Sequence, residues 1–142
     1  MLTEEEKQNL ELARRYIELV ADPSSRLEDL KPLFDEQIVW REMPNKFAPM
    51  GRTSDFATAT ASFQKGRAFL PRQTYTIRYA IASGDTVAME ISWTGEVAQE
   101  IGPFAAGTQL KAELATFIRF LDGKIVSQTD YLCYHPVDES KS

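Results

Sequence analysis

Cysteine and histidine are nearly absent from this chain, which contains one of each, Cys133 and His135. A single thiol has no partner for an internal disulfide, and one thiol with one imidazole cannot supply the ligands of a Cys/His zinc site. The sequence also has no glycine-rich loop of the kind that binds phosphates or dinucleotides. We therefore expect the protein to work without a metal ion or an organic cofactor.

Clustered positive charge and long apolar runs are missing as well. The formal net charge is −5 and no Lys/Arg-rich run occurs, so binding to the phosphate backbone of nucleic acid is not expected. No apolar run approaches the roughly 18 residues that span a bilayer, and the acidic N-terminus is unlike a signal peptide. These absences predict a cytoplasmic protein that binds neither nucleic acid nor membranes.

The composition that remains is typical of one globular domain. Hydrophobic residues make up 43% and charged residues 26% of the sequence, which is ordinary for a folded protein. The length of 142 residues fits one hydrophobic core better than two. We predict a single domain over residues 1–142, with a frayed polar tail at 138–142.

Hydrophobic periodicity predicts three helices in the N-terminal half of the chain. Thr3 begins a capping-box pattern, and the helix that follows ends at Asp22, before a proline. A short helix is expected over 25–30. Thr53 or Ser54 is expected to cap the third helix, which carries Phe63.

Strand-like alternation dominates the rest of the sequence. A brief strand at 37–43 and a loop at 44–52 lie between the second and third helices. Four longer strands follow, joined by turns such as Asp122-Gly123, and their expected ranges are 74–82, 86–97, 109–121 and 124–134. This order predicts an α+β fold with the helices on one face of a mostly antiparallel sheet.

Four short segments match motifs of one known superfamily. Residues 15–20 resemble the first helix of bacterial ketosteroid isomerases, and 93–95 are similar to a Trp-x-Gly in one of their strands. Residues 118–120 and 122–125 resemble the hairpin before their last strand. Over about 8–134 the chain thus resembles the nuclear-transport-factor-2-like superfamily, in its branch of SnoaL-like polyketide cyclases and ketosteroid isomerases. The resemblance implies a cone-shaped, curved sheet with three N-terminal helices packed on its concave face.

The resemblance to the isomerases implies some of their site residues but not all. Tyr16 matches the tyrosine that supplies a catalytic hydrogen bond in those enzymes. Their base, an aspartate near the end of the first strand, falls on Glu42 or on Met43, depending on the anchor used for counting. Their second donor, a protonated aspartate, falls on Thr116, which is a weaker donor. Ketosteroid isomerisation itself is therefore not the expected reaction.

The last strand offers a different acid. Asp130 resembles the aspartate that SnoaL-like cyclases use as a general acid/base, and limonene-epoxide hydrolases have an Asp-Tyr at a similar place, here Asp130-Tyr131. Those hydrolases also need an arginine and an acid two residues apart. The matching positions are Ala88 and Glu90, so the arginine is missing.

Strand alternation, in the register that the resemblance implies, separates an inner from an outer face. Asp130 on the apolar inner face would lose hydration, which raises the pKa of a carboxyl group and suits a general base. In the alternative interpretation Asp130 pairs with Arg41, Arg67 or Tyr16 and is structural. The expected substrate-binding wall consists of Trp40, Phe63, Met89, Trp93, Leu114, Thr116, Gln128 and Leu132.

We therefore predict a small-molecule enzyme of the isomerase or cyclase type, with Asp130, Tyr16 and Glu42 as catalytic residues. It would transfer a proton without a cofactor on an apolar, polyketide- or steroid-like substrate. Two alternatives remain: a non-catalytic module that binds an apolar ligand or acts as a dimeric scaffold, and an epoxide-hydrolase-like enzyme. Because members of the superfamily commonly dimerise and Phe117 is expected on the outer face, a homodimer through that face is also expected.

Overall fold

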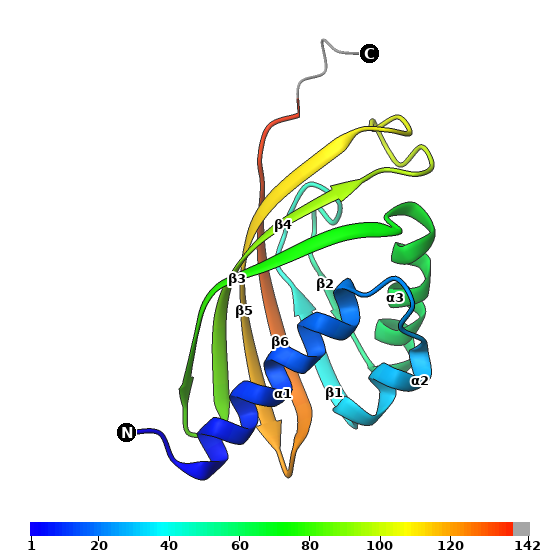
Figure 1. Ribbon diagram of the computed structural model, residues 1–142. Coiled ribbons are helices and arrows are strands. Elements are labelled where there is room, and N and C mark those ends of the chain that lie inside the picture. The colour runs from blue at the N-terminus through cyan, green and yellow to red at the C-terminus, as the bar shows by residue number, and fades with distance from the viewer. Residues whose placement is uncertain (138–142) are drawn as a thin grey trace.

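A curved six-stranded sheet forms the body of the protein in the computed structural model, which describes residues 1–137 (Figure 1). The strand order is β2-β1-β6-β5-β4-β3. Neighbouring strands are antiparallel except β1 and β6, which are parallel. The strands are β1 (Phe34–Glu42), β2 (Arg52–Ser54), β3 (Arg72–Ser83), β4 (Thr86–Glu96), β5 (Gln109–Leu121) and β6 (Lys124–Tyr134). The α+β prediction is confirmed, whereas the predicted tail at 138–142 lies outside the described residues.

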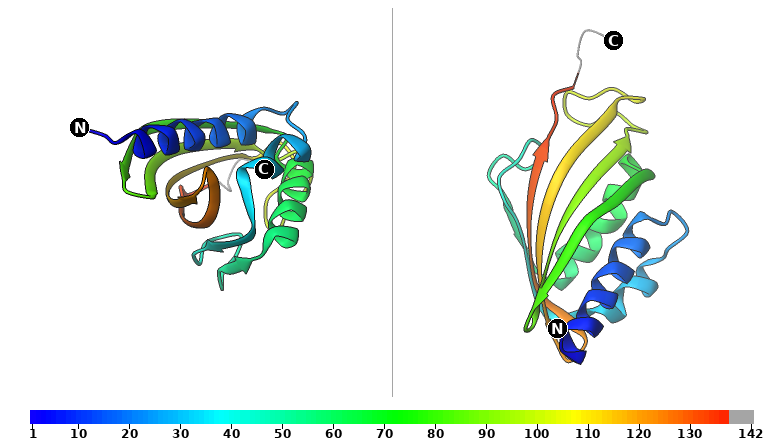
Figure 2. Two further views of the ribbon diagram at one scale, coloured as in Figure 1. Left: turned by 90° about the horizontal axis from the view of Figure 1, so that it is seen from below. Right: turned by 60° about the vertical axis from the view of Figure 1, so that its left-hand side comes forward.

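The three helices lie on the concave side of this sheet, as predicted (Figure 2). They are α1 (Glu4–Ala21), α2 (Leu27–Leu30), which continues into a 3-10 turn at Lys31–Leu33, and α3 (Phe56–Phe69). Helix α1 lies against β3 and β4, whereas α3 packs beside β1. The hydrophobic core lies between the helices and this face of the sheet.

Local sequence accounts for the first helix. The Glu6 amide donates to Thr3 Oγ1 over 3.1 Å and the Thr3 amide donates to Glu6 Oε1 over 2.8 Å, so the predicted capping box is confirmed. Ala13, Tyr16 and Ile17 lie at helical spacing and are buried against the sheet. Burial of an aliphatic side chain such as Ile17 stabilises the fold by about 1.5–3 kcal/mol.

The expected start of the third helix is wrong. Thr53 and Ser54 lie in β2, where they pair with Arg41 and Trp40 of β1. The cap is Asp55, whose carboxylate accepts a hydrogen bond from the Thr58 amide over 2.9 Å. A strand as short as β2 has no periodicity of its own, and an aspartate caps as well as a serine or threonine.

The C-terminal meander follows the predicted alternation closely. Val87, Met89, Ile91 and Trp93 are all buried on the inner face of β4. Gly95 permits this packing at one end, because a Cβ there would lie 2.7 Å from the ring of Trp93. The hairpin at Asp122-Gly123 is confirmed: both residues have positive φ, 49° and 77°, as a two-residue turn between β5 and β6 requires.

The outer face of the sheet carries a patch of exposed apolar side chains. Phe117 and Tyr131 contact each other edge to face, with ring centroids 6.0 Å apart. In the register of the sheet, Ile81 of β3 is level with Phe117 on the far side of β4. Tyr79 of β3 is likewise level with Tyr131 of β6. A register shift between Ile77 and Tyr79 turns these β3 side chains outward. Within residues 1–137, no helix has the length and apolar character needed to cross a bilayer.

Candidate active site

An apolar cavity of about 200 Å³, which we call the inner cavity, lies between the helices and the concave face of the sheet. Helix α1 contributes Tyr16 to its lining and α3 contributes Phe63. The sheet contributes most of the polar atoms, and its lining residues include Trp40, Leu114, Thr116, Gln128, Asp130 and Leu132. Six of the eight residues expected in the wall line this cavity, and they come from α3, β1, β5 and β6.

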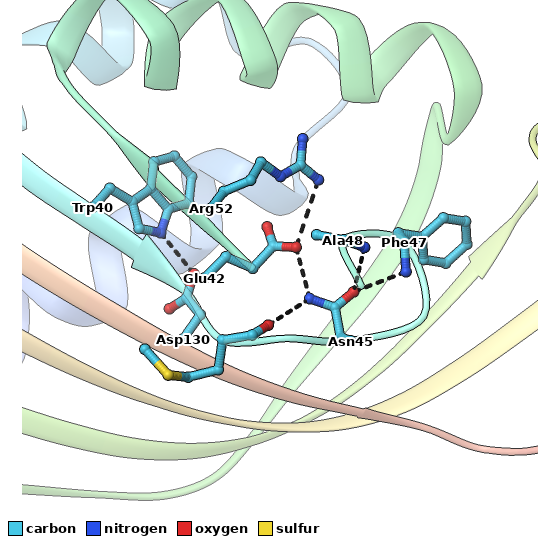
Figure 3. Close-up of polar contacts among 8 residues, drawn as sticks. Trp40, Glu42, Asn45, Phe47, Ala48, Arg52 and Asp130 are labelled. Atoms are coloured by element: carbon cyan, nitrogen blue, oxygen red, sulfur yellow. Dashed lines mark hydrogen bonds and ion pairs between the residues drawn. The ribbon is translucent and has the colours of Figure 1, made fainter. Parts of the chain in front are cut away.

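Asp130 is the central polar group of the inner cavity. Its Oδ1 accepts hydrogen bonds from Thr116 Oγ1 over 2.6 Å and from Gln128 Nε2 over 3.1 Å. Its Oδ2 accepts one from the indole Nε1 of Trp40 over 2.8 Å, which Figure 3 shows. Thr116 on β5 and Trp40 on β1 come from the two strands that flank β6. The sheet itself therefore holds the carboxylate in place.

All three of these donors are uncharged. In the described part of the chain no Lys, Arg or His forms an ion pair with Asp130. Arg67, one of the partners considered above, instead donates to main-chain carbonyls after α1, including that of Pro23 at 3.1 Å. Desolvation raises the pKa of Asp130 above its ordinary value, although the hydrogen bonds from Thr116, Gln128 and Trp40 oppose that rise.

Tyr16 reaches the same network through Gln128. The Gln128 amide Nε2 donates to the Tyr16 hydroxyl oxygen over 3.1 Å, so one amide group contacts both Tyr16 and Asp130. Among residues 1–137 the Tyr16 hydroxyl makes no hydrogen bond as a donor, which leaves its proton available to a ligand. Burial, reinforced by the nearby charge of Asp130, raises the pKa of Tyr16, so the hydroxyl keeps this proton.

Glu42 lies beside Asp130 at the end of β1, where the two residues are directly paired across the parallel strands. Its side chain faces the cavity, so of the two positions considered above the acid is the one that lies at the site. Its Oε2 accepts a hydrogen bond from Asn45 Nδ2 over 2.8 Å and lies 3.5 Å from Arg52 (Figure 3). Asn45 also accepts from the Phe47 amide over 2.9 Å, which fixes the loop after β1.

A second and larger cavity, of about 560 Å³, opens beyond Glu42, and we call it the outer cavity. Trp40, Phe63 and Tyr75 line both cavities, so the two are adjacent. The loops that follow β1 and β4 form much of the outer lining through residues such as Phe47 and Phe104, whose rings lie 5.4 Å apart.

Two of the expected wall residues lie elsewhere. Met89 and Trp93 line neither cavity and belong to the packed core, where the Trp93 indole donates to Gln73 Oε1 over 2.9 Å. Sequence reasoning also missed Tyr75, which lies on β3 and faces both cavities. Its place in the alternating strand was a usable signal, since Tyr75 pairs with Trp93 of β4 and shares its face.

The arrangement is that of a cone-shaped α+β domain with a partly buried carboxylate lining an apolar cavity. The sequence profile of the SnoaL-like domain matches residues 13–128, and the chain belongs to this family of the nuclear-transport-factor-2-like superfamily. Among residues 1–137 no three His, Cys, Asp or Glu side chains converge in a way that would hold a metal ion.

Several solved structures share this fold. IdmH of Streptomyces antibioticus, a proposed polyketide cyclase, is 23% identical over 88% of this chain and 91% of its own, with a TM-score of 0.74. A proposed SnoaL-like polyketide cyclase from Jannaschia sp. CCS1 is 15% identical over 93% and 90%, with a TM-score of 0.78. A proposed polyketide cyclase from Acidithiobacillus ferrooxidans is 22% identical over 88% and 87%, with a TM-score of 0.72. No curated protein matches the sequence significantly.

Proposed function

We propose that the protein is a small-molecule enzyme of the isomerase or cyclase type, in which Asp130 is the general base. One observation carries the proposal: the Asp130 carboxylate lies in an apolar cavity, held by three uncharged donors and by no cation among the described residues. A carboxylate in such surroundings has a raised pKa and gains basicity that a solvated or ion-paired one lacks.

The proposed reaction begins with a proton on a carbon next to a carbonyl group of the substrate. Asp130 takes this proton, the C–H electron pair forms the enolate double bond, and the carbonyl π electrons move to the oxygen. The free hydroxyl proton of Tyr16 donates a hydrogen bond to that oxyanion. The enolate then either regains the proton at another carbon, which is isomerisation, or attacks a second carbonyl carbon, which is aldol cyclisation. In the second case the carbonyl π electrons move to the oxygen, and the alkoxide that forms takes the proton back from Asp130.

Deuterium exchange tests the first step without knowledge of the natural substrate. Two- and three-ring ketones such as 2-tetralone are incubated with the protein in D₂O, and loss of the α-proton signal is followed by NMR. We expect the wild type to accelerate exchange of at least one of these ketones and Asp130→Asn to lose that acceleration. Glu90→Gln, a carboxylate change on the outer face of β4, serves as the matched control. Exchange at equal rates in wild type and Asp130→Asn would refute the proposal.

The alternative of a non-catalytic binding module makes a different prediction for Asp130. A ¹³C-carboxyl NMR titration, assigned with Asp130→Asn, measures the pKa of this group directly. A pKa above the ordinary value of about 3.9, responsive to a bound ketone, supports the general base. A pKa at or below that value, together with ligand binding but no exchange, would establish the binding module instead.

Epoxide hydrolysis is not supported by the geometry of β4. Glu90, the acid at the position that corresponds to the hydrolases' acid, is exposed on the outer face and accepts a hydrogen bond from the Tyr79 hydroxyl over 3.3 Å. It therefore points away from Asp130 and from both cavities.

We also propose that two copies pair through the outer face of the sheet. The support is the apolar patch of Phe117, Tyr131, Ile81 and Tyr79, exposed side chains that β3, β5 and β6 present on this face. Sedimentation equilibrium should show a dimer that Phe117→Ser weakens, while Leu121→Ser, an exposed change at the end of β5, leaves it intact. A monomeric wild type at 100 µM, a concentration on the order of that at which weak dimers form, would refute the pairing.

A further inference from the structure

The two cavities differ in the sign of the charged residues that line them. Among the described residues that line the inner cavity, the charged ones are two acids, Glu42 and Asp130. The outer cavity has the opposite character: its lining contains four cationic residues, Lys46, Arg52, Lys65 and Arg67, and a single acid, Glu42. In a chain with a net charge of −5 this is a local reversal of sign.

The four cations differ in how far other groups of the protein engage them. Arg67 is occupied by main-chain carbonyls, including those of Leu19 and Pro23. Arg52 reaches Glu42 only at 3.5 Å, and its side chain is 51% exposed. Lys46 lies 5.8 Å from the centroid of the Phe104 ring. Within residues 1–137 neither Lys46 nor Lys65 forms an ion pair.

The volumes of the cavities indicate a ligand that occupies both. A dry cavity of about 150 Å³ can hold a benzene molecule, so the inner cavity of about 200 Å³ accommodates one or two rings. The outer cavity of about 560 Å³ adjoins it along Trp40, Phe63 and Tyr75. A molecule of more than two rings with its reacting ring beside Asp130 would therefore extend past Glu42 into the region lined by cations.

We infer that the ligand is an amphipathic organic anion, with an apolar ring body in the inner cavity and its anionic group among Lys46, Arg52 and Lys65. The assignment of the reacting end to the inner cavity rests on the function proposed above. The reverse orientation would place the anion next to Asp130 and Glu42, where repulsion is strong because most residues that line the cavity are apolar. The charge pattern thus selects the substrate and also fixes its direction.

Two fluorescent probes with the same ring scaffold test this inference. 8-Anilino-1-naphthalenesulfonate carries an anionic group, and N-phenyl-1-naphthylamine is its neutral counterpart. The double variant Lys46→Gln/Lys65→Gln should weaken binding of the sulfonate roughly five- to tenfold, since each partly exposed ion pair contributes modestly, and should leave binding of the neutral probe within about twofold. Lys111→Gln, an exposed lysine on the outer face of β5, is the matched control and should change neither affinity.

The salt dependence of probe affinity provides a second test of the same contact. Raising KCl from 20 to 500 mM, a change that shortens the screening length severalfold, should weaken the sulfonate and not the neutral probe. Unchanged sulfonate affinity in the double variant, or an equal loss for both probes, would overturn the inference.

The binding assay is independent of the proposed chemistry. Asp130→Asn should keep the preference of the wild type for the sulfonate. If charge-selective binding is observed but deuterium exchange is not, the proposed function fails and the anion site stands. If exchange is observed without charge selectivity, the anion site fails alone.

Discussion

Asp130 and Glu42 are paired residues on neighbouring strands, yet their surroundings have little in common. Asp130 is held by uncharged donors inside an apolar cavity. Glu42 contacts an amide and a guanidinium at the junction with the outer cavity, and its side chain is 25% exposed. The comparison teaches that pairing within a sheet does not by itself give two carboxylates the same chemistry, which depends on hydration and on the charge of their partners.

The difference has a simple origin in the sheet. Asp130 lies in the middle of β6, with β5 and β1 on either side to supply Thr116 and Trp40. Glu42 is the last residue of β1, where the chain leaves the sheet for the loop fixed by Asn45. The neighbouring strands therefore desolvate Asp130, whereas Glu42 at the strand end stays partly exposed.

The largest expected effect is on the rate of proton exchange. Asp130→Asn should reduce enzyme-catalysed exchange by roughly 10²- to 10⁴-fold, the usual contribution of a positioned base. Glu42→Gln should reduce it less than about tenfold, because the general base is retained. Both are measured by the same deuterium assay. An equal reduction of the exchange rate in the two variants would show that the two carboxylates contribute alike, and would contradict the prediction.

A smaller effect is expected on stability. Thr116→Val removes a buried donor to Asp130 and should lower the free energy of unfolding by about 1–3 kcal/mol at pH 8, since a carboxylate loses a buried hydrogen bond. Arg52→Gln breaks a partly exposed ion pair and should change it by less than about 1 kcal/mol. Urea denaturation of the two variants measures both changes. A larger loss of unfolding free energy in Arg52→Gln than in Thr116→Val would contradict the prediction.

The pH dependence of stability should separate wild type from Asp130→Asn. Because burial raises the pKa of Asp130, the folded state binds this proton more tightly than the unfolded state. The stabilisation from protonated Asp130 is therefore fully present below the ordinary pKa of about 3.9 and is lost as pH rises through the raised pKa. Urea midpoints for both proteins from pH 4 to 8, a span of roughly four units above that ordinary value, should show the wild type losing stability relative to Asp130→Asn. A constant difference would indicate a carboxyl group with no perturbed pKa.

The smallest expected effect concerns the indole of Trp40. Trp40→Phe removes one donor from Asp130 Oδ2, so the pKa of Asp130 should rise further and the pH profile of exchange should move to higher pH. Asn45→Ala removes the corresponding donor from Glu42 and should leave the profile in place. Carboxyl NMR titration of the Trp40→Phe variant provides the direct check, and a lowered pKa would contradict the assigned role of the indole.

Much of the fold was predictable because its signals are local. The capping box at Thr3, the turn at Asp122-Gly123 and the period of two along β5 and β6 each depend on neighbouring residues only. The strand β2 was missed because it exists through its pairing with β1, a contact between distant segments. The register shift after Ile77 was unpredictable for the same reason.

The site was predictable in part. Alternation placed Asp130, Thr116 and Gln128 on one face, and the structure brings them into one network with Tyr16. It could not separate cavity wall from packed core, so Met89 was assigned to the wrong surface. That boundary depends on how far the helices lie from the sheet, which no single strand encodes.

The outer cavity is bounded largely by chain segments that are not part of the sheet. Phe47 and Phe104 come from loops, while the paired positions of Glu42 and Asp130 are set by strand hydrogen bonds such as that from the Met43 amide to the Asp130 carbonyl, at 3.0 Å. Changes in these loops would therefore reshape the outer cavity while the sheet keeps the proposed base in place. New substrate preferences could then be engineered by loop grafting.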